Sequence, residues 1–486
     1  MPRTRRQPTG MVRLNMQSAA QSDMKAFFEP EAVAVIGSLK ENGGLAYVAI
    51  QNMLRFGYSG RIYPINPSYT EAHGFKAYPN IGEVGQPVDL AIVITPPPTV
   101  PGIVEECAGS GVKAVLVVSE NFGEAGGEGM KLQQRLTEIR RRTGIRIMGP
   151  NTIGLVNTSN GFITVPYYIA YDRVQKGGIA YCSQSGFVGP TAQPLKERGY
   201  PIARMCDVGN KCDVNEVDLL NYLADVPEAK VVAMHLEDVK DGRRFMEAAR
   251  KVVARKPLLI LKSGRTEAGA RATAPHTSSL AGDEQVYDAA FRQVGAFRVN
   301  TWHEFWEIPR FFASQPLPKG NRIGIVTHTG GAGVVATDAA VEAGLTVAKF
   351  TEKTLKKLYD FSPRLVYNPC DMGPILSIVD NPFYVQEEGT VAIMEDPNVD
   401  CAAIATYGME QIIEPILAMF VRLKQRTSKP FVVWVYGMQL TAMEEMVRQL
   451  EAHGIPAYLE FETAVKALGI AARYAAMRRD LERAAA

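Results

Sequence analysis

The strongest constraint on the fold of this 486-residue chain is an alternation of short apolar runs with amphipathic segments. Apolar strands separated by helices of 10 to 15 residues are typical of parallel sheets that are buried on both faces. The alternation therefore predicts a doubly wound α/β architecture. From residue 33 it reads VAVIG, a helical segment (45–56), RIYPINP, VDLAIVIT, a helical segment (98–110), KAVLVVS, a helical segment (127–142) and IRIMGPN.

The alternation begins again at two later points, GGIAYCSQSGFVG (177–189) and GNRIGIVTHTGGAGV (320–334). Both combine a glycine-led strand, a turn of the form Ser/Thr-x-Ser/Thr-Gly and a helix, which indicates an internal repeat. The chain is also longer than one hydrophobic core usually supports. We therefore expect a basic flexible tail (1–23), three α/β domains (24–155, 156–312 and 322–486, the last with a C-terminal helix) and a Pro/Gly-containing linker (313–321).

Composition excludes several classes of protein. A net charge of +2 gives no bias toward nucleic acid or membrane, and the apolar runs end after six or seven residues, far short of the roughly 20 that cross a bilayer. The six cysteines are scattered without CxxC pairs, which favours reduced thiols in a cytoplasmic chain over disulfides or a metal site. The basic, acid-free first 22 residues also fit a transit peptide, but a flexible tail is the preferred interpretation.

The first strand-to-helix junction, AVIGSLKENGGLA, suggests a ligand site. Its glycines, Gly37, Gly43 and Gly44, permit close approach of backbone to phosphate, and a helix N-terminus favours negative charge. The junction is not a complete GxGxxG, and Asn66 and Pro67 stand where a ribose-binding acid would follow the second strand. NAD is therefore disfavoured, and an adenine-bearing ligand other than a dinucleotide fits better. After the third strand, the prolines of Thr95–Pro98 predict an extended loop.

The second junction, CSQSGFVG, places Ser183, Ser185 and Gly186 at the predicted start of a helix. Hydroxyls and free N–H groups in that position can form a phosphate or oxyanion site. A simple helix cap is an equally good explanation, because serine is a preferred N-cap residue. A GxSxG nucleophile elbow fits poorly, since no glycine lies two residues before either serine.

His276 lies in KSGRTEAGARATAPHTSSLAGDE, a long stretch with few apolar residues. A lone histidine is usually structural, but loops of this length inside compact domains are commonly functional. A neutral imidazole is a nucleophile near pH 7, and its phosphorylation needs a carboxylate that orients the ring and supports the cation. Glu237 ends the strand KVVAMHLE and is predicted at the same sheet edge.

Six stretches of the chain, in order, resemble the α subunit of ADP-forming acyl-CoA synthetases, which are relatives of succinyl-CoA synthetase. The resemblance covers residues 24 to 475 approximately. The stretches are FFEPEAVAVIGSLKENG; GRIYPINP; PVDLAIVITPPPTVPGIVEECAGSGVKAVLVVSENFGE; IRIMGPNTIGLVN; GGIAYCSQSGFVG with DVGNKCDVNEVDLLNYLADVPEAKVVAMHLEDVKDGRRF; and LKSGRTEAGARATAPHTSSLAG.

The resemblance implies a CoA-binding Rossmann-like domain followed by two flavodoxin-like domains. It implies that His276 is phosphorylated and that Glu237 steadies it, with Glu216 as the second candidate for that carboxylate. Phosphate binding is assigned to Ser183, Gln184, Ser185 and Gly186. Contacts with coenzyme A are assigned to Gly37, Ser38, Leu39, Lys40, Asn66, Thr95, Pro96, Pro97, Ser119, Glu120, Asn121 and Asn151.

The same resemblance implies a partner. The chain ends in AARYAAMRRDLERAAA and contains no P-loop lysine motif, so we expect an ATP-grasp β subunit that holds ATP or ADP with Mg²⁺. The implied substrate is a small carboxylic acid or its acyl-CoA, and the implied assembly is a heterotetramer. The chain departs from the family at Pro275, Ser278 and Ser279 beside the histidine. The alternatives are a CoA-binding sensor without catalysis and a redox Rossmann protein.

Overall fold

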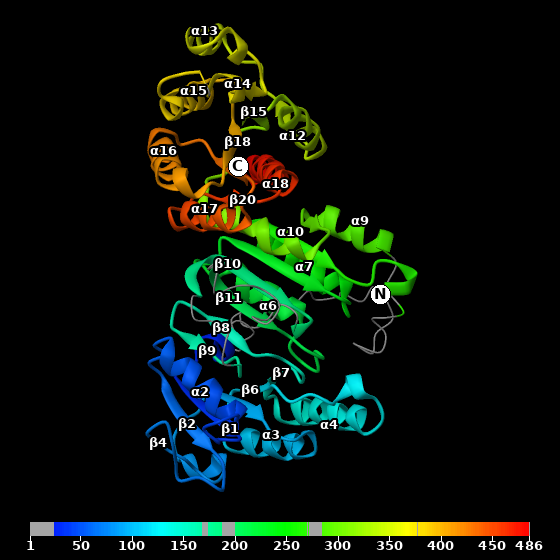
Figure 1. Ribbon diagram of the computed structural model, residues 1–486. Coiled ribbons are helices and arrows are strands. Elements are labelled where there is room, and N and C mark those ends of the chain that lie inside the picture. Colours follow the sequence, from blue (N-terminus) through cyan, green and yellow to red (C-terminus); the bar gives the residue numbers. More distant parts are fainter. Residues whose placement is uncertain are drawn as a thin grey trace, which may run out of the picture. The chain divides into compact units, whose positions relative to one another are not determined.

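A computed structural model describes residues 24–167, 174–186, 200–269, 271, 284–376 and 378–485. The chain forms two compact units, Met1–Arg298 and Val299–Ala486 (Figure 1). His276, the N-terminal tail and the helix expected after the SQSG turn lie outside the described residues. Among the described residues, no helix has both the length and the apolar character needed to span a bilayer.

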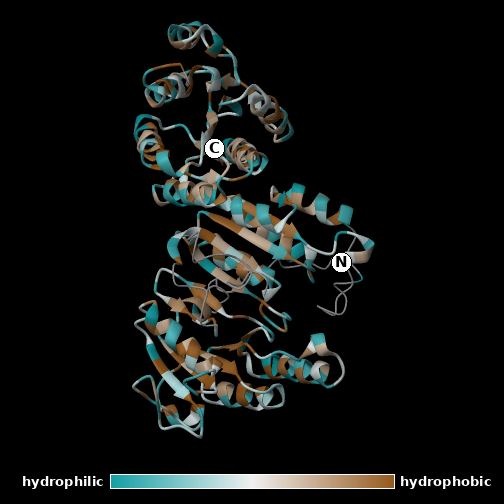
Figure 2. Ribbon diagram, in the orientation of Figure 1, coloured by the Kyte–Doolittle hydropathy of each residue, from teal (hydrophilic) through white to brown (hydrophobic). Residues whose placement is uncertain are grey.

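The first sheet of unit 1 confirms the predicted alternation of strands and helices. Five parallel strands have the order β2-β1-β5-β6-β7. They are β1 (Ala32–Gly37), β2 (Arg61–Ile65), β5 (Leu90–Ile94), β6 (Ala114–Val117) and β7 (Arg146–Met148), with helices α2 (Leu45–Arg55), α3 (Val100–Gly109) and α4 (Gly127–Thr143). Figure 2 shows these strands as mostly apolar, which agrees with their burial and explains why they read as continuous hydrophobic runs.

The expectation of an extended loop at Thr95–Pro98 was wrong at Pro97 and Pro98. The 3-10 helix η2 (Pro97–Thr99) follows β5 and leads directly into α3. Proline has a fixed φ near the helical value and lacks only an N–H group that the first turn leaves unpaired anyway. Pro97 and Pro98 therefore start a helix, and only Pro96, with a ψ of 136°, keeps the extended form.

The second sheet of unit 1 has seven strands in the order β14-β13-β12-β10-β11-β8-β9, of which β10 to β13 are parallel. The carboxyl ends of these four strands lie at one edge and carry the candidate active site. The strands are β8 (Leu155–Asn157), β9 (Phe162–Ile163), β10 (Gln175–Ser183), β11 (Pro201–Asp207), β12 (Val231–Leu236), β13 (Leu258–Lys262) and β14 (Phe297–Val299), and the helices are α6 (Glu216–Ala224), α7 (Gly242–Val253) and α9 (Glu284–Val294).

Unit 2 contains the third sheet, with the order β16-β15-β18-β19-β20 and β17 paired to β15. Its strands are β15 (Arg322–Thr327), β16 (Thr346–Val347), β17 (Cys370–Asp371), β18 (Cys401–Tyr407), β19 (Phe431–Tyr436) and β20 (Ala457–Tyr458). Its helices are α10 (Trp302–Glu307), α11 (Pro309–Ser314), α12 (Gly330–Glu342), α13 (Glu352–Phe361), α14 (Gly373–Leu376), α15 (Pro382–Glu395), α16 (Ile413–Arg426), α17 (Leu440–Ala452) and α18 (Phe461–Ala485). The helix α18 is the predicted C-terminal helix, and α12 begins in the predicted second turn of the internal repeat.

Candidate active site

A cavity of about 540 Å³ opens at the carboxyl ends of β1, β2 and β5. The direction of the chain crossings reverses between β1 and β5, and such points bind ligands in open α/β sheets. Five isoleucines line the cavity and provide apolar walls that fit a nucleobase: Ile36, Ile65, Ile81, Ile94 and Ile103.

Five of the residues assigned to coenzyme A by sequence line this cavity: Gly37, Ser38, Asn66, Thr95 and Pro96. The other seven are not among its lining residues; they are Leu39, Lys40, Pro97, Ser119, Glu120, Asn121 and Asn151. Asn80, Thr99 and Glu106 also line the cavity and were not predicted from the sequence. No motif marks these three, because they come from a 3-10 helix cap and from the helix after β5.

Several of the residues predicted to contact coenzyme A form hydrogen bonds with one another at this sheet edge. The Asn66 amide donates a hydrogen bond to the carbonyl of Gly37 at 2.8 Å. The Ser119 hydroxyl donates to the carbonyl of Thr95 at 2.6 Å, which ties the ends of β5 and β6 together. A Cβ atom at Gly37 would lie 2.5 Å from the carbonyl oxygen of Ile94, so this position accepts only glycine.

The SQSG turn follows β10 and is held mainly by its own side chains. The Ser183 hydroxyl is buried, hydrogen-bonds with Nδ1 of His235 at 2.9 Å and accepts from the N–H of Ser185. Nε2 of His235 hydrogen-bonds with the Ser263 hydroxyl at 2.7 Å, so one buried imidazole connects the ends of β10 and β13. Sequence reasoning missed His235, since a histidine inside the strand carries no motif.

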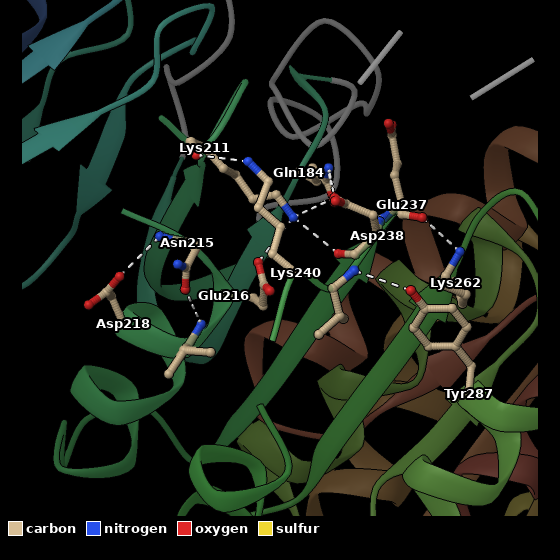
Figure 3. A network of polar contacts seen from close by, with 12 residues as sticks. Gln184, Lys211, Asn215, Glu216, Asp218, Glu237, Asp238, Lys240, Lys262 and Tyr287 are labelled. Carbon is tan, nitrogen blue, oxygen red and sulfur yellow. Dashed lines mark hydrogen bonds and ion pairs between the residues drawn. The ribbon is translucent and has the colours of Figure 1, made fainter. Parts of the chain in front are cut away.

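Gln184 connects the SQSG turn to the residues that follow β12. Its Oε1 accepts the backbone N–H groups of Glu237 and Asp238, each at 3.0 Å, and its Nε2 donates to the Asp238 carboxylate (Figure 3). Ser185 and Gly186 are half-buried. The assignment of the turn to phosphate binding stays a prediction.

The two candidate carboxylates have different surroundings. Glu216 is the first residue of α6, is 2% exposed, and its Oε2 lies 3.1 Å from Nζ of Lys211. Glu237 directly follows β12 and is 7% exposed. Figure 3 shows its side chain extending away from Lys211, while its backbone carbonyl accepts a hydrogen bond from Lys262 at 2.8 Å.

Three lysines and three acidic residues lie close together at this sheet edge (Figure 3). Burial favours a neutral Asp238, but the nearby Lys211 ammonium and its hydrogen bond outweigh burial and hold the pKa of Asp238 below its usual value. Burial also lowers the pKa of Lys262, whose ammonium lies 4.6 Å from the ring centre of Tyr287. Figure 3 shows Lys211 between the carboxylates of Glu216 and Asp238, whereas Lys240 donates to the carbonyl of Lys211 and Lys262 to the carbonyl of Glu237.

Two family models match the chain. Residues 31–158 match a CoA binding domain, and residues 176–312 match a succinyl-CoA ligase like flavodoxin domain. The chain is 38% identical over 445 residues to the acetate–CoA ligase [ADP-forming] II subunit alpha of Pyrococcus furiosus, which covers 89% of this chain and 93% of the relative. It is 34% identical to the acetate–CoA ligase [ADP-forming] II of Archaeoglobus fulgidus, covering 94% of this chain and 68% of the relative.

Solved structures resemble the chain over similar lengths. The dinucleotide forming acetyl-coenzyme A synthetase 1 of Ca. Korarchaeum cryptofilum, in complex with phosphate and ADP, superimposes with a TM-score of 0.85 at 30% identity. The superposition covers 95% of this chain and 99% of that chain. A structure of the apo form gives a TM-score of 0.84.

Proposed function

Because this chain belongs to the family of ADP-forming acyl-CoA synthetases, we propose that His276 carries the phosphoryl group in its reaction. The chain is an acid–thiol ligase that interconverts acyl-CoA, ADP and phosphate with a carboxylic acid, CoA and ATP. The relatives do not favour the CoA sensor or the redox protein. One observation carries the proposal. The carboxyl edge of the second sheet holds the SQSG turn, Glu237 and Ser263 together. Ser263 directly follows β13, and the segment that contains His276 comes after it in the sequence.

In the direction of ATP synthesis, a phosphate oxygen attacks the thioester carbonyl, the C–S bond breaks, and CoA leaves as its thiol. The product is an acyl phosphate. A ring nitrogen of His276 then attacks phosphorus, the carboxylic acid leaves, and the phosphoryl group passes from the histidine to ADP. The SQSG turn binds the phosphate, and a carboxylate holds the imidazole in one tautomer and stabilises its cation.

Glu237 is the better candidate for that carboxylate. The Glu216 carboxylate is engaged with Lys211 deep in the unit. The Glu237 side chain projects from the sheet edge on the side away from that ion pair (Figure 3). Glu216 therefore has a structural role, and Glu237 orients the histidine.

The reaction also needs a nucleotide site. Relatives are named as alpha subunits, which supports a second subunit. We assign to it an ATP-grasp fold, the ADP or ATP with Mg²⁺, and assembly with this chain into a heterotetramer. Acetate is named in several relatives, so a small carboxylic acid of that kind is the proposed substrate.

Transfer of labelled phosphate from ATP to this chain, in the presence of the second subunit, tests the assignment. His276→Asn should abolish incorporation and leave CoA binding intact. Glu237→Gln should slow incorporation by about 10² to 10⁴, the range typical of positioned proton-transfer groups. Glu216→Gln should mainly lower the melting temperature. A fully active His276→Asn variant would contradict the mechanism, and a fully active Glu237→Gln beside an inactive Glu216→Gln would move the carboxylate role to Glu216.

A further inference from the structure

Lys211 is held in an unusual state for a lysine. Its side chain is 1% exposed, and its backbone has a φ of 53°, in the left-handed region. Lysines are almost never fully buried unless paired, and residues other than glycine adopt this φ only where surrounding contacts impose it. The contacts that impose it connect two parts of unit 1.

The backbone around Lys211 is seated on a turn of the first domain. The N–H of Asn210 donates to the carbonyl of Pro150 at 2.9 Å, and the N–H of Cys212 donates to the carbonyl of Gly149 at 3.1 Å. The same turn includes Asn151, one of the residues assigned to coenzyme A. The segment 208–212, which we call the bridge segment, is therefore fixed to the CoA-binding domain.

The ammonium of Lys211 is fixed to the other side of the site (Figure 3). It donates to the Asp238 carboxylate at 2.5 Å, to the Asp238 carbonyl at 3.0 Å and to Glu216 at 3.1 Å. These contacts use all three of its protons. Asp238 in turn accepts from Gln184, whose own carbonyl oxygen accepts the N–H of Glu237.

We propose that Lys211 is a positioning residue of the synthetase reaction, which holds the SQSG turn and Glu237 in place relative to the CoA-binding domain. The inference rests on the proposed function of those two elements. Without the ammonium, the carboxylates of Glu216 and Asp238 would face each other across the space it leaves. Asp238 would lose its hydrogen bonds from Lys211, repulsion from Glu216 would turn it further away, and Gln184 would be released, so both the SQSG turn and the backbone of Glu237 would lose their common anchor.

Lys211→Met removes the charge and keeps most of the side-chain length. Lys211→Arg keeps the charge, and the double variant Lys211→Met/Glu216→Gln also removes one carboxylate, so it remains informative if the single variant fails to fold. Lys256→Met is the matched control. Lys256 is another buried lysine of unit 1, in the turn between α7 and β13, and its ammonium donates to the carbonyls of Leu223 and Val226, away from the site.

The measurement is the steady-state rate of ATP formation from acetyl-CoA, phosphate and ADP by the chain with its second subunit. We expect Lys211→Met and the double variant to raise the KM for phosphate or lower kcat by at least about tenfold, because misplacement of reacting groups by about 1 Å has effects of this size. The KM for acetyl-CoA should stay within about twofold, and Lys211→Arg should recover part of the loss. Lys256→Met should lower the melting temperature without changing kcat or either KM.

Unchanged kinetics in Lys211→Met would overturn the inference. So would equal increases in the KM values for phosphate and acetyl-CoA, since these would indicate a general loss of structure. If the wild-type chain and its second subunit made no ATP, both the proposed function and the inference would be refuted. An active wild-type pair with an equally active Lys211→Met variant would refute the inference alone.

Discussion

At the scale of single residues, Asp207 is a buried carboxyl group with a strongly raised pKa, and it lies where the two domains of unit 1 join. It is the last residue of β11 and is fully buried. Its Oδ1 accepts hydrogen bonds from the Thr152 hydroxyl at 2.8 Å and from the N–H of Ile153 at 2.9 Å. Its Oδ2 has no hydrogen-bond partner among the described residues. Burial raises the pKa of Asp207 to about 7 despite these hydrogen bonds.

This shift makes the stability of unit 1 depend on pH. The folded pKa of about 7 lies above the value of about 3.9 for an unfolded aspartate, so between these values the folded state binds the extra proton. The stabilisation is present below about pH 4 and is lost as the pH rises toward 7, with a slope of at most about 1.4 kcal/mol per pH unit. We expect Asp207→Asn to remove this slope, so that its melting temperature rises relative to wild type as the pH increases from about 4 to about 7 and the difference stays constant above that.

An exposed aspartate provides the control for that measurement. Asp480 lies on α18 with 77% of its side chain exposed, and Asp480→Asn should follow the wild-type melting temperature at every pH. If Asp207→Asn also ran parallel to wild type, the carboxyl group of Asp207 would be ionised throughout, and its burial would not control stability.

The sequence located both candidate carboxylates and put Glu237 first, but it could not show how Glu216 is paired. Glu237 was predicted from its place at a strand end, and the structure places it there. The pairing of Glu216 depends on Lys211, whose inward direction follows from a left-handed backbone conformation. A lysine in NKCDVNE gives no sign of that conformation, because lysine is normally exposed and rarely adopts it.

At the scale of elements, the bridge segment and the turn at 149–151 approach each other at Gly209. This glycine has a φ of 53°, and a Cβ atom would lie 2.2 Å from the carbonyl oxygen of Pro150. Backbone contacts this close leave no room for a side chain, and the obstructing atom is a carbonyl that other hydrogen bonds already fix. Gly209 is therefore needed both for its conformation and for its lack of a side chain.

Gly209→Ala should separate these two elements. Gly85 is the matched control, because its φ is 64° and no atom lies within 4 Å of a Cβ built there. Each alanine adds the left-handed strain of about 1 to 2 kcal/mol, and Gly209→Ala adds the clash. We expect Gly209→Ala to lower the free energy of unfolding by at least about 1 kcal/mol more than Gly85→Ala, measured by urea unfolding. Equal losses of unfolding free energy in the two variants would mean that the bridge segment can move away from the turn at 149–151 at little cost.

The alternation of elements was predictable, whereas the way the domains join was not. Period and length of the apolar runs identified the strands of the first sheet and its helices, because burial on both faces leaves a clear hydrophobic signal. The strands β8 and β9 have three and two residues and pair antiparallel to the edge of the second sheet. Segments this short carry no period, so their place depends on tertiary contacts alone.

At the scale of the whole molecule, the short helices α10 and α11 are anchored within unit 2. Lys466 on α18 donates to Glu304 on α10 at 2.6 Å. Arg310 on α11 donates to the carbonyl of Ala457 in β20 at 2.8 Å, and α11 also packs against α18. A division of the chain near residue 299 therefore keeps these contacts, and a division in the predicted linker at 313–321 breaks them.

Two fragments distinguish these divisions. Residues 300–486 retain both helices and should melt cooperatively on their own, since the fragment holds the third sheet with its core. Residues 321–486 lose the fully buried Phe311 and the Arg310 contact, and α18 loses the cover that α11 provides. Full burial of one such aromatic side chain is worth about 1.5 to 3 kcal/mol, and the shorter fragment also lacks the buried Phe305 and Trp306, so it should melt at least several degrees lower, measured by calorimetry. Equal melting temperatures would show that α10 and α11 belong energetically to unit 1, and the boundary predicted at 313–321 would then be the better one.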